Sequence, residues 1–323
     1  MKKRLTIVLL LTILAIFFCI RNTRASISSL VQKRLYTITY KFTFNNKCLR
    51  DKIDIWMPFP PELKEQSVVD FKIYPKDVSK DLSYDPLYGT PILHIETHNN
   101  KYIKVIYVVK RKALRTNRAL LHKVSYKSSI LFKQFSFTPS NPSTQKIVHK
   151  IAVRVTKNDL NYINKVHDIY NFIISYLKYG HIPGSGRGDL AWLFKTREGS
   201  CVDYHSLFMA LCSEIHVPTL FEIGMMFPPN KNSGIVTHYH SWVKFFIPKI
   251  GWIPVDVSEA DKHPNLRKYY FGNLTSNRIT LSMGRWIRVD NKRLNFFTNP
   301  IVKIANKNSQ SYKLVITYKC KLY

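Results

Sequence analysis

Alternating apolar and polar positions in the first third of the chain predict a set of short β-strands. The longest alternation runs from Leu35 to Phe44, where every second side chain is aromatic or aliphatic. A period of two is typical of a strand with one buried face. Shorter apolar runs follow at 53–58, 91–97 and 102–110. Because short strands at this spacing suit two packed antiparallel sheets, we expect a β-sandwich-like N-terminal domain over residues 31–118.

The middle of the chain changes to a helical period. After a polar connector, expected over 119–156, apolar residues recur three and four positions apart between Lys157 and Tyr179. A second apolar helix is predicted from Cys201 onward, preceded by a turn and an N-cap at Gly199 and Ser200. This pattern places Cys201 in the first turn of a helix.

Two further strands are predicted beyond that helix. The extended run 235–247 carries His240, and 248–251 is typical of a turn. A second strand is predicted over 252–257. A hairpin of this shape would bring Asp256 back alongside His240.

These predictions give a thiol, an imidazole and a carboxylate their own structural elements. The amides and dipole of a helix start favour a thiolate at Cys201 and lower its pKa. A carboxylate at Asp256 would hold the His240 ring in one tautomer and stabilise its charged form. Together, the three groups are a minimal set for nucleophilic acyl transfer.

Three segments resemble the core motifs of the transglutaminase-like superfamily, in its bacterial branch: GSCVDYHSLFMALCSEIHVPTLFEIG, HSWVKFFIP and GWIPVDVSEADK. The family motifs are a Gly-x-Cys helix start, a His-x-Trp strand and a Gly-Trp-x-Pro-x-Asp strand. The resemblance covers residues 160–262 and extends more weakly through YYFGNLTSNRITLSMGR. It implies that Cys201 is the nucleophile, that His240 is the general base and acid, and that Asp256 is the orienting carboxylate.

The resemblance also implies a fold. It predicts an α+β chain whose papain-like or transglutaminase-like core, expected at 157–262, packs the Cys-bearing helix on an antiparallel sheet bearing His and Asp. The tail over 263–323 is expected as a C-terminal β-rich extension. One departure concerns Val217-Pro218-Thr219, which stands where the family usually has Ile-Pro-Ala-Arg. We therefore expect a basic side chain near the cleft to be missing.

The implied function is a cysteine-dependent acyl transfer through a thioester, with a protein or peptide as substrate. Hydrolysis of peptide or amide bonds is the favoured outcome, since calcium-site spacing and the extra domains of the animal cross-linking enzymes are not apparent in the sequence. The alternatives are a protein cross-linking transamidase and, in another class, a non-catalytic protein that binds peptides or envelope polymers. Bacterial members that resemble this chain are often described as cysteine proteases. No cofactor is expected.

Other residues have plainer interpretations. Cys212 lies deep in the predicted apolar helix and is expected to be a core residue. The pair His238 and His240 suggests zinc, but no third ligand at suitable spacing is apparent, so no metal is expected. Trp242 and Trp252 are expected to pack beside the site and shelter it from water.

A glycine-rich run at 180–188 could be mistaken for a phosphate-binding loop. Such a loop follows a strand and opens a helix, whereas this run follows a predicted helix and lacks the Lys-Ser/Thr ending. We expect a mobile loop at the rim of the cleft. The segment Asp189–Lys195 after it predicts a short helix, with Trp192 near the substrate entrance.

The N-terminus predicts export. Lys2, Lys3 and Arg4 precede an apolar run from Leu5 to Ile20, and small residues follow at Thr23 and Ala25. The run is short for a membrane span and suits the hydrophobic part of a signal peptide. Residues 1–25 are therefore expected to be a signal peptide or an N-terminal anchor. The protein would then be periplasmic or secreted, or held at the membrane through residues 5–20.

The net charge and the number of cysteines say less about function than the motifs do. A formal net charge of +30 fits association with an anionic envelope or membrane surface. No nucleic-acid signature is present, so no specific nucleic-acid partner is expected. The cysteines are too few for a disulfide framework, and one bridge between Cys48 and Cys320 stays open.

Overall fold

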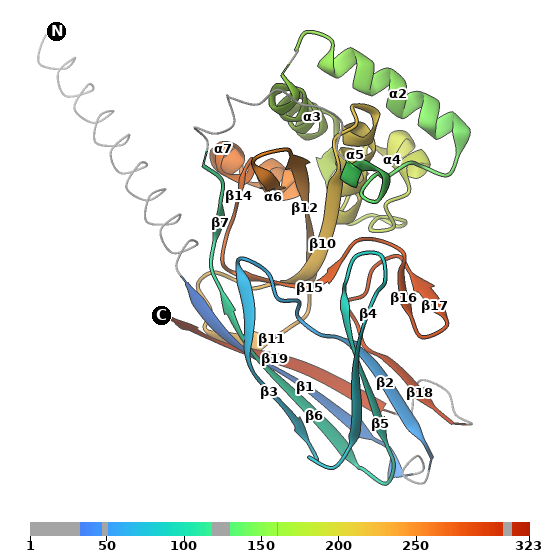
Figure 1. Cartoon of the computed structure of the whole chain (residues 1–323), viewed down its shortest axis with the longest axis vertical. Coiled ribbons are helices and arrows are strands. Elements are labelled where there is room, and N and C mark those ends of the chain that lie inside the picture. Colours follow the sequence, from blue (N-terminus) through green and yellow to red (C-terminus); the bar gives the residue numbers. More distant parts are fainter. Residues whose placement is uncertain (1–32, 47–50, 118–129, 160, 306–311) are drawn as a thin grey trace, which may run out of the picture.

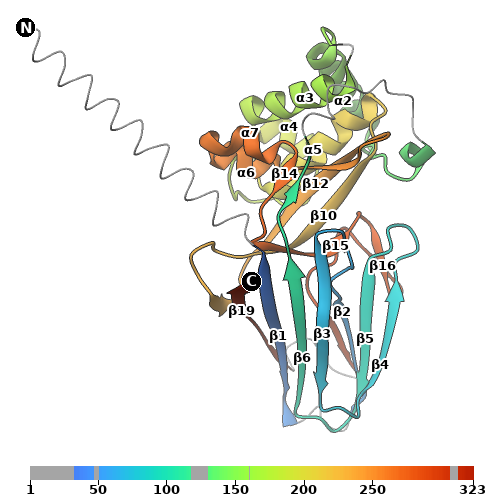
Figure 2. The ribbon, with the colours of Figure 1, turned by 60° about the vertical axis from the view of Figure 1, so that its left-hand side comes forward.

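The structure is a computed structural model that describes residues 33–46, 51–117, 130–159, 161–305 and 312–323. A β-sandwich forms one half of the molecule, and a sheet covered by helices forms the other (Figures 1 and 2). The predicted α+β class and β-rich N-terminal region are confirmed.

Two antiparallel sheets make up the sandwich. The first has the strand order β11 (Ser233–Ile235), β19 (Tyr312–Leu322), β1 (Arg34–Phe44), β6 (Tyr102–Arg111) and β3 (Gln66–Tyr74). The second has the order β18 (Ile301–Ile304), β2 (Ile53–Pro58), β5 (Pro91–Thr97) and β4 (Ser79–Tyr84). Every second residue of β1 from Tyr36 to Phe44 is buried, as the alternation predicts. Full burial of one such side chain stabilises the fold by about 1.5–3 kcal/mol.

Two strands of the sandwich, β3 and β4, were not predicted from the pattern. An irregularity between Val68 and Asp70 shifts the register of β3 against β6, and this breaks its alternation. All six residues of β4 are exposed at the edge of the second sheet, so the strand has no apolar face to detect. Its ladder of hydrogen bonds runs to β5.

The tail divides between the two halves of the molecule. Strands β18 and β19 complete the sandwich, whereas β15 (Arg278–Met283) joins the sheet of the other half. The strands of the tail pair with distant parts of the chain. The division into the five expected segments stays a prediction.

The second half has a four-stranded antiparallel sheet in the order β13 (Gly251–Val255), β12 (Tyr239–Ile247), β10 (Thr219–Met226) and β15. The helices that cover it are α2 (Pro142–Thr156), α3 (Tyr162–Tyr176), α4 (Leu190–Thr196), α5 (Cys201–Glu214), α6 (Val257–Lys262) and α7 (Arg267–Tyr270). Helix α5 is central, because all its residues from Cys201 to Ser213 are buried.

Shorter elements connect these parts. They are the 3-10 turns η3 (Ile130–Lys133) and η4 (Pro264–Leu266), and the strand pairs β7 (Leu114–Arg115) with β14 (Asn273–Leu274), β8 (Lys178–Tyr179) with β9 (Glu198–Gly199), and β16 (Ile287–Val289) with β17 (Lys292–Leu294).

A buried ionic cluster joins the two halves. The Lys244 Nζ atom of β12 lies 2.7 Å from Glu65 Oε1 and 2.6 Å from Glu222 Oε1 of β10. The guanidinium of Arg111, on β6, lies 3.9 Å from the same Glu65 oxygen. Arg111 and Glu222 are fully buried, so each charge depends on the partners in this cluster.

The amide of Gln66 makes a second link at the same junction. Its Oε1 accepts from the Thr280 backbone N–H at 2.8 Å, and its Nε2 donates to the Thr280 carbonyl at 3.0 Å. One side chain therefore satisfies both backbone groups of a residue on β15, the edge strand, as a neighbouring strand would. The sandwich thus supports the sheet that carries His240.

No helix in the described part of the chain is both long enough and apolar enough to span a membrane. The expected signal or anchor segment, residues 1–25, lies outside the described residues.

The ionic cluster predicts a large effect of Glu65→Ala. This change leaves the buried Arg111 and Lys244 with one carboxylate fewer, so we expect the free energy of unfolding to fall by about 3–5 kcal/mol. Denaturant titration would measure it. Glu96→Ala is the matched control, because Glu96 pairs with Lys52 at the surface and should cost at most about 1 kcal/mol. Equal losses in the two variants would contradict the role given to the cluster.

Candidate active site

Cys201 is the first residue of α5, as predicted. Ser200 is the N-cap, and its backbone N–H donates to Asp203 Oδ2 at 2.8 Å. The first backbone N–H groups of a helix have no carbonyl four residues earlier to bind. They therefore favour a negative charge at Cys201. The side chain is nearly buried, with 6% of its surface exposed.

His240 and Asp256 meet across the predicted hairpin. Strands β12 and β13 pair from Ile247–Gly251 to Val243–Val255, so Asp256 follows directly after the paired region. It is the N-cap of α6 and lies outside β13, whereas the predicted strand over 252–257 included it. Its Oδ2 accepts from His240 Nε2 at 2.9 Å. Since Nε2 is engaged, Nδ1 is the ring nitrogen left to interact with Cys201.

The electrostatics of the three groups favour an ion pair. Burial alone would raise the pKa of the Cys201 thiol, but the charge and hydrogen bond of His240 lower this pKa below its usual value. Burial would lower the pKa of His240, yet the negative charges of Asp256 and Cys201 raise it to about 10. Both shifts favour the pair of thiolate and imidazolium over the neutral pair of thiol and imidazole.

Arg278, a residue that the motifs did not predict, binds the same carboxylate. Its Nη1 donates to Asp256 Oδ2 at 2.8 Å, and both side chains are fully buried. Burial would raise the pKa of Asp256, but the positive charges of His240 and Arg278 hold it well below its usual value. No basic residue stands in the segment Val217-Pro218-Thr219. A strand far from it in the sequence, β15, brings a different basic side chain to the site carboxylate.

His205 is a second buried histidine beside the site. Its ring centroid lies 6.4 Å from that of His240, in an edge-on arrangement. Burial lowers the pKa of His205 to about 3, so this ring is neutral. It differs from His240 in having no carboxylate within hydrogen-bonding distance, since Asp256 Oδ1 lies 3.6 Å from its Nε2.

The glycine-rich run is held in place by Asp203. The backbone N–H groups of Gly186 and Gly188 donate to its two carboxylate oxygens at 2.7 and 2.9 Å. The expected mobile loop is thus tethered to the first turn of α5. Gly184 and Gly188 have positive φ angles, which only glycine adopts without strain. The expected short helix is α4, with Asp189 as its N-cap.

The two tryptophans have different environments. Trp242 is fully buried, lies 6.2 Å from the His240 ring and donates to Glu222 Oε2 at 2.6 Å. It therefore shelters the site, as expected. Trp252 pairs with Phe246 near the turn of the hairpin, at the end away from His240. The expectation for Trp252 is wrong. The strand register pairs it with Phe246, which lies about six residues, or roughly 20 Å, from His240 along β12.

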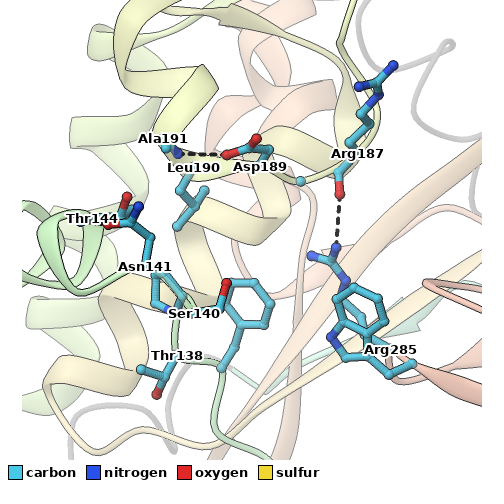
Figure 3. A pocket seen from close by; sticks show the side chains of 13 residues that line it. Thr138, Ser140, Asn141, Thr144, Arg187, Asp189, Leu190, Ala191 and Arg285 are labelled. Atoms are coloured by element: carbon cyan, nitrogen blue, oxygen red, sulfur yellow. Dashed lines mark hydrogen bonds between the residues drawn. The ribbon is translucent and has the colours of Figure 1, made fainter. Parts of the chain in front are cut away.

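A cavity of about 530 Å³ adjoins the tethered loop (Figure 3). Its walls come from the start of α2, the turn around Gly188 and the segment Arg285–Trp286. The Arg285 guanidinium donates to the carbonyl of Arg187 at 3.1 Å and also to Ser206 on α5. These bonds fix one wall of the cavity against the helix that begins with Cys201.

The remaining candidates have structural environments. Cys212 is fully buried in α5, and burial raises its thiol pKa well above the usual value. Cys320 is buried, and Cys48, with which a bridge stays open, lies outside the described residues. His238 is exposed. Among the described residues, no three His, Cys, Asp or Glu side chains are grouped to hold a metal ion.

Comparison with known proteins supports the resemblance found in the motifs. Residues 149–257 match the family model of the Transglutaminase-like superfamily, which confirms that resemblance. A protein described as uncharacterized, from Haemophilus influenzae, is 20% identical over 293 residues, covering 77% of this chain and 79% of that protein.

One solved structure shares the fold. A protein of Cytophaga hutchinsonii described as a "putative cysteine protease" is similar with a TM-score of 0.50 and 15% identity, over 90% of this chain and 98% of that one. The periplasmic domain of TgpA from Pseudomonas aeruginosa has a TM-score of 0.38 and 14% identity, over 71% and 91% of the two chains. The first of these likenesses confirms the predicted fold.

The tethered loop predicts different costs at two glycines with the same φ of +68°. A Cβ at Gly188 would lie 2.3 Å from Ser206 Oγ, whereas a Cβ at Gly89 would meet nothing within 4 Å. Gly89→Ala should cost about 1 kcal/mol from the backbone alone, and Gly188→Ala about 2 kcal/mol more. Unfolding free energies measure this difference. Equal costs would contradict tight packing of the loop.

Proposed function

We propose that this protein, whose residues 149–257 form a transglutaminase-like domain, is a cysteine-dependent acyl-transfer enzyme that hydrolyses peptide or amide bonds. The observation that carries the proposal is the buried array of Cys201, His240 and Asp256 at the meeting point of α5, β12 and α6. A thiolate beside an imidazolium that a carboxylate orients is the arrangement that nucleophilic acyl transfer requires.

The first half of the reaction forms a thioester. The Cys201 thiolate attacks the carbonyl carbon, and a new C–S bond replaces the carbonyl π bond. Backbone N–H groups at the start of α5, including that of Cys201, stabilise the resulting oxyanion. The tetrahedral intermediate collapses as His240 gives its Nδ1 proton to the departing amine, and the C–N bond breaks.

The second half releases the acyl group. His240, now neutral, accepts a proton from water as the water oxygen attacks the thioester carbonyl. The C–S bond then breaks, the acid leaves, and the thiolate and imidazolium are restored. Asp256, kept ionised by Arg278, holds the His240 ring in one orientation throughout.

Two other functions are compatible with the same fold. A primary amine in place of water would make the protein a cross-linking transamidase. A binding protein for peptides or envelope polymers would need no reactive thiol, so the lowered pKa of Cys201 favours the enzyme. The N-terminal basic and apolar residues support export to the periplasm or beyond, where an anionic envelope would attract the basic chain.

The pKa directions predict how alkylation of Cys201 depends on pH. Since the thiolate reacts, a lowered pKa keeps the thiol reactive below the ordinary value of about 8.5, and the rate falls only as pH falls through the lowered pKa. His240→Ala removes the charge that lowers it. We expect Cys201 to react with iodoacetamide at least about tenfold more slowly in this variant at neutral pH.

Peptide mapping by mass spectrometry would follow each cysteine separately in that experiment. His149→Ala is the matched control, because His149 lies at the surface against Glu214 and should leave the rate unchanged. If Cys201 reacts no faster than the thiols of the unfolded chain, and His240→Ala has no effect, the enzyme proposal is wrong.

The products distinguish hydrolysis from transamidation. In ¹⁸O-water, with peptide substrates supplied with and without a primary amine, we expect the free acid carrying one ¹⁸O atom. Cys201→Ser should abolish it. A conjugate of the amine that exceeds the acid would show a transamidase, and a reactive thiol that forms neither product on any peptide would leave binding as the function of the fold.

A further inference from the structure

We propose that the outward face of the five-stranded sheet of the sandwich docks on an anionic phospholipid surface. The face consists of the side chains of β11, β19, β1, β6 and β3 that point away from the sandwich core. The inference rests on the proposed attraction to an anionic envelope and deepens it, because it names the part of the molecule that makes the contact. It is independent of the reaction proposed for Cys201.

The register of the strands gathers lysines on this face. Along β1, buried aromatic and aliphatic residues alternate with residues that point outward, and Lys41 is one of these. Lys41 lies directly opposite Lys104 of β6. Leu35 of β1 lies between Lys110 of β6 and Lys321 of β19. We call these outward positions the lysine face, and its lysines are Lys41, Lys72, Lys104, Lys110, Lys313, Lys319 and Lys321.

Little negative charge accompanies these lysines. Asp70 of β3 points the same way, and its Oδ2 lies 2.7 Å from Lys72 Nζ. The other lysines of the face form no ion pair with a carboxylate of the described residues. Like charges directly opposite each other destabilise a pair of strands, and Lys41 opposite Lys104 is such a pair. An anionic partner would turn this local repulsion into attraction.

The opposite face of the sandwich shows that a basic composition alone does not explain the lysine face. On the second sheet, the outward positions of β2, β5 and β4 include Asp54, Glu96 and Asp81. Lys303 of β18 lies across from Asp54. The two outer faces of one sandwich therefore differ in charge. Of the two, the lysine face has the sign that an anionic surface attracts.

The size and the margins of the lysine face fit a membrane. Its longer strands have ten or eleven residues, which gives a length of about 35 Å, and five strands give a width of about 20 Å (Figure 1). Tyr102 and Ile235 point outward at its margins, and they are 49% and 64% exposed. Basic residues beside exposed apolar side chains bind the boundary between lipid headgroups and acyl chains.

The N-terminal segment can engage the same membrane. Lys33 precedes β1, and its carbonyl accepts from the Tyr323 N–H at 3.2 Å. Lys110 Nζ lies 5.7 Å from the centre of the Tyr323 ring, so the chain enters β1 at the end of the lysine face. Residues 21–32 connect the expected anchor to Lys33, and a chain of this length spans at most about 40 Å.

Partition of the full chain into vesicles tests the proposal. The quantity measured is the partition coefficient for phosphatidylglycerol–phosphatidylcholine vesicles divided by that for phosphatidylcholine vesicles, because this ratio cancels the contribution of the N-terminal apolar run. A triple variant with Lys41→Gln, Lys110→Gln and Lys319→Gln should lower the ratio about a hundredfold, since each lysine near an anionic surface contributes about a factor of five.

The matched control is a triple variant with Lys146→Gln, Lys150→Gln and Lys195→Gln. It removes the same charge from exposed positions on α2 and α4 and should lower the ratio by less than about threefold, because lysines far from the surface are screened. Equal losses in the two triple variants would overturn the assignment of the contact to the lysine face.

Acetylation of lysines, followed by peptide mapping, locates the contact directly. Vesicles with phosphatidylglycerol should slow the acetylation of Lys41, Lys110 and Lys319 and leave that of Lys146 and Lys150 unchanged. Equal protection of both groups would overturn the proposal.

A soluble polyanion distinguishes a membrane from an anionic polymer. Tyr102→Ser combined with Ile235→Ser should weaken binding to anionic vesicles several-fold and leave binding to polyglutamate unchanged, because a polymer in water offers no apolar layer. Equal losses with both partners, or no loss with vesicles, would overturn the membrane as the partner. Alkylation of Cys201 decides the proposed reaction separately, and its rate should be the same in all these variants.

Discussion

A single buried carboxylate organises the site. Asp256 is fully buried, and it stays ionised only because His240 and Arg278 both bind its Oδ2. Its other oxygen accepts from the Ser258 hydroxyl and from the Glu259 backbone N–H, and so caps α6. An unpaired charge at this depth would cost several kcal/mol. Pairing it requires that β12, β15 and the start of α6 lie close together, because they carry His240, Arg278 and Asp256. The position of the imidazole beside the thiol is a consequence of this pairing.

The face of β12 that carries His240 is turned toward the sandwich. Ser241 and Val243 point to α5, while Trp242 and Lys244 point to the opposite side and bind Glu222. The sandwich supplies Glu65 to that side, as well as the Gln66 amide that pairs with the edge strand β15. The sandwich therefore acts as a support for the strand that bears the catalytic base in our proposal. This gives the sandwich a physical role in supporting the site.

The environment of the site gives two neighbouring histidines opposite shifts of pKa. His240 has a carboxylate at 2.9 Å and a raised pKa, while His205 has a backbone N–H at 3.2 Å and a lowered one. Burial disfavours the charged form of both, so the partner decides the outcome.

The sequence by itself determined the elements whose signal is local. Alternation predicted β1, the Gly-Ser turn predicted the start of α5 at Cys201, and three ordered motifs predicted that Cys201, His240 and Asp256 come together. It did not indicate β4, which has no buried face, or Arg278, whose role depends on β15 lying beside β10 in the sheet. The charge states of His205 and His240 likewise depend on distant partners. Tertiary structure alone decided these features, because ion pairs and burial are properties of residues that are neighbours in space, whereas periodicity and caps are properties of neighbours in the chain.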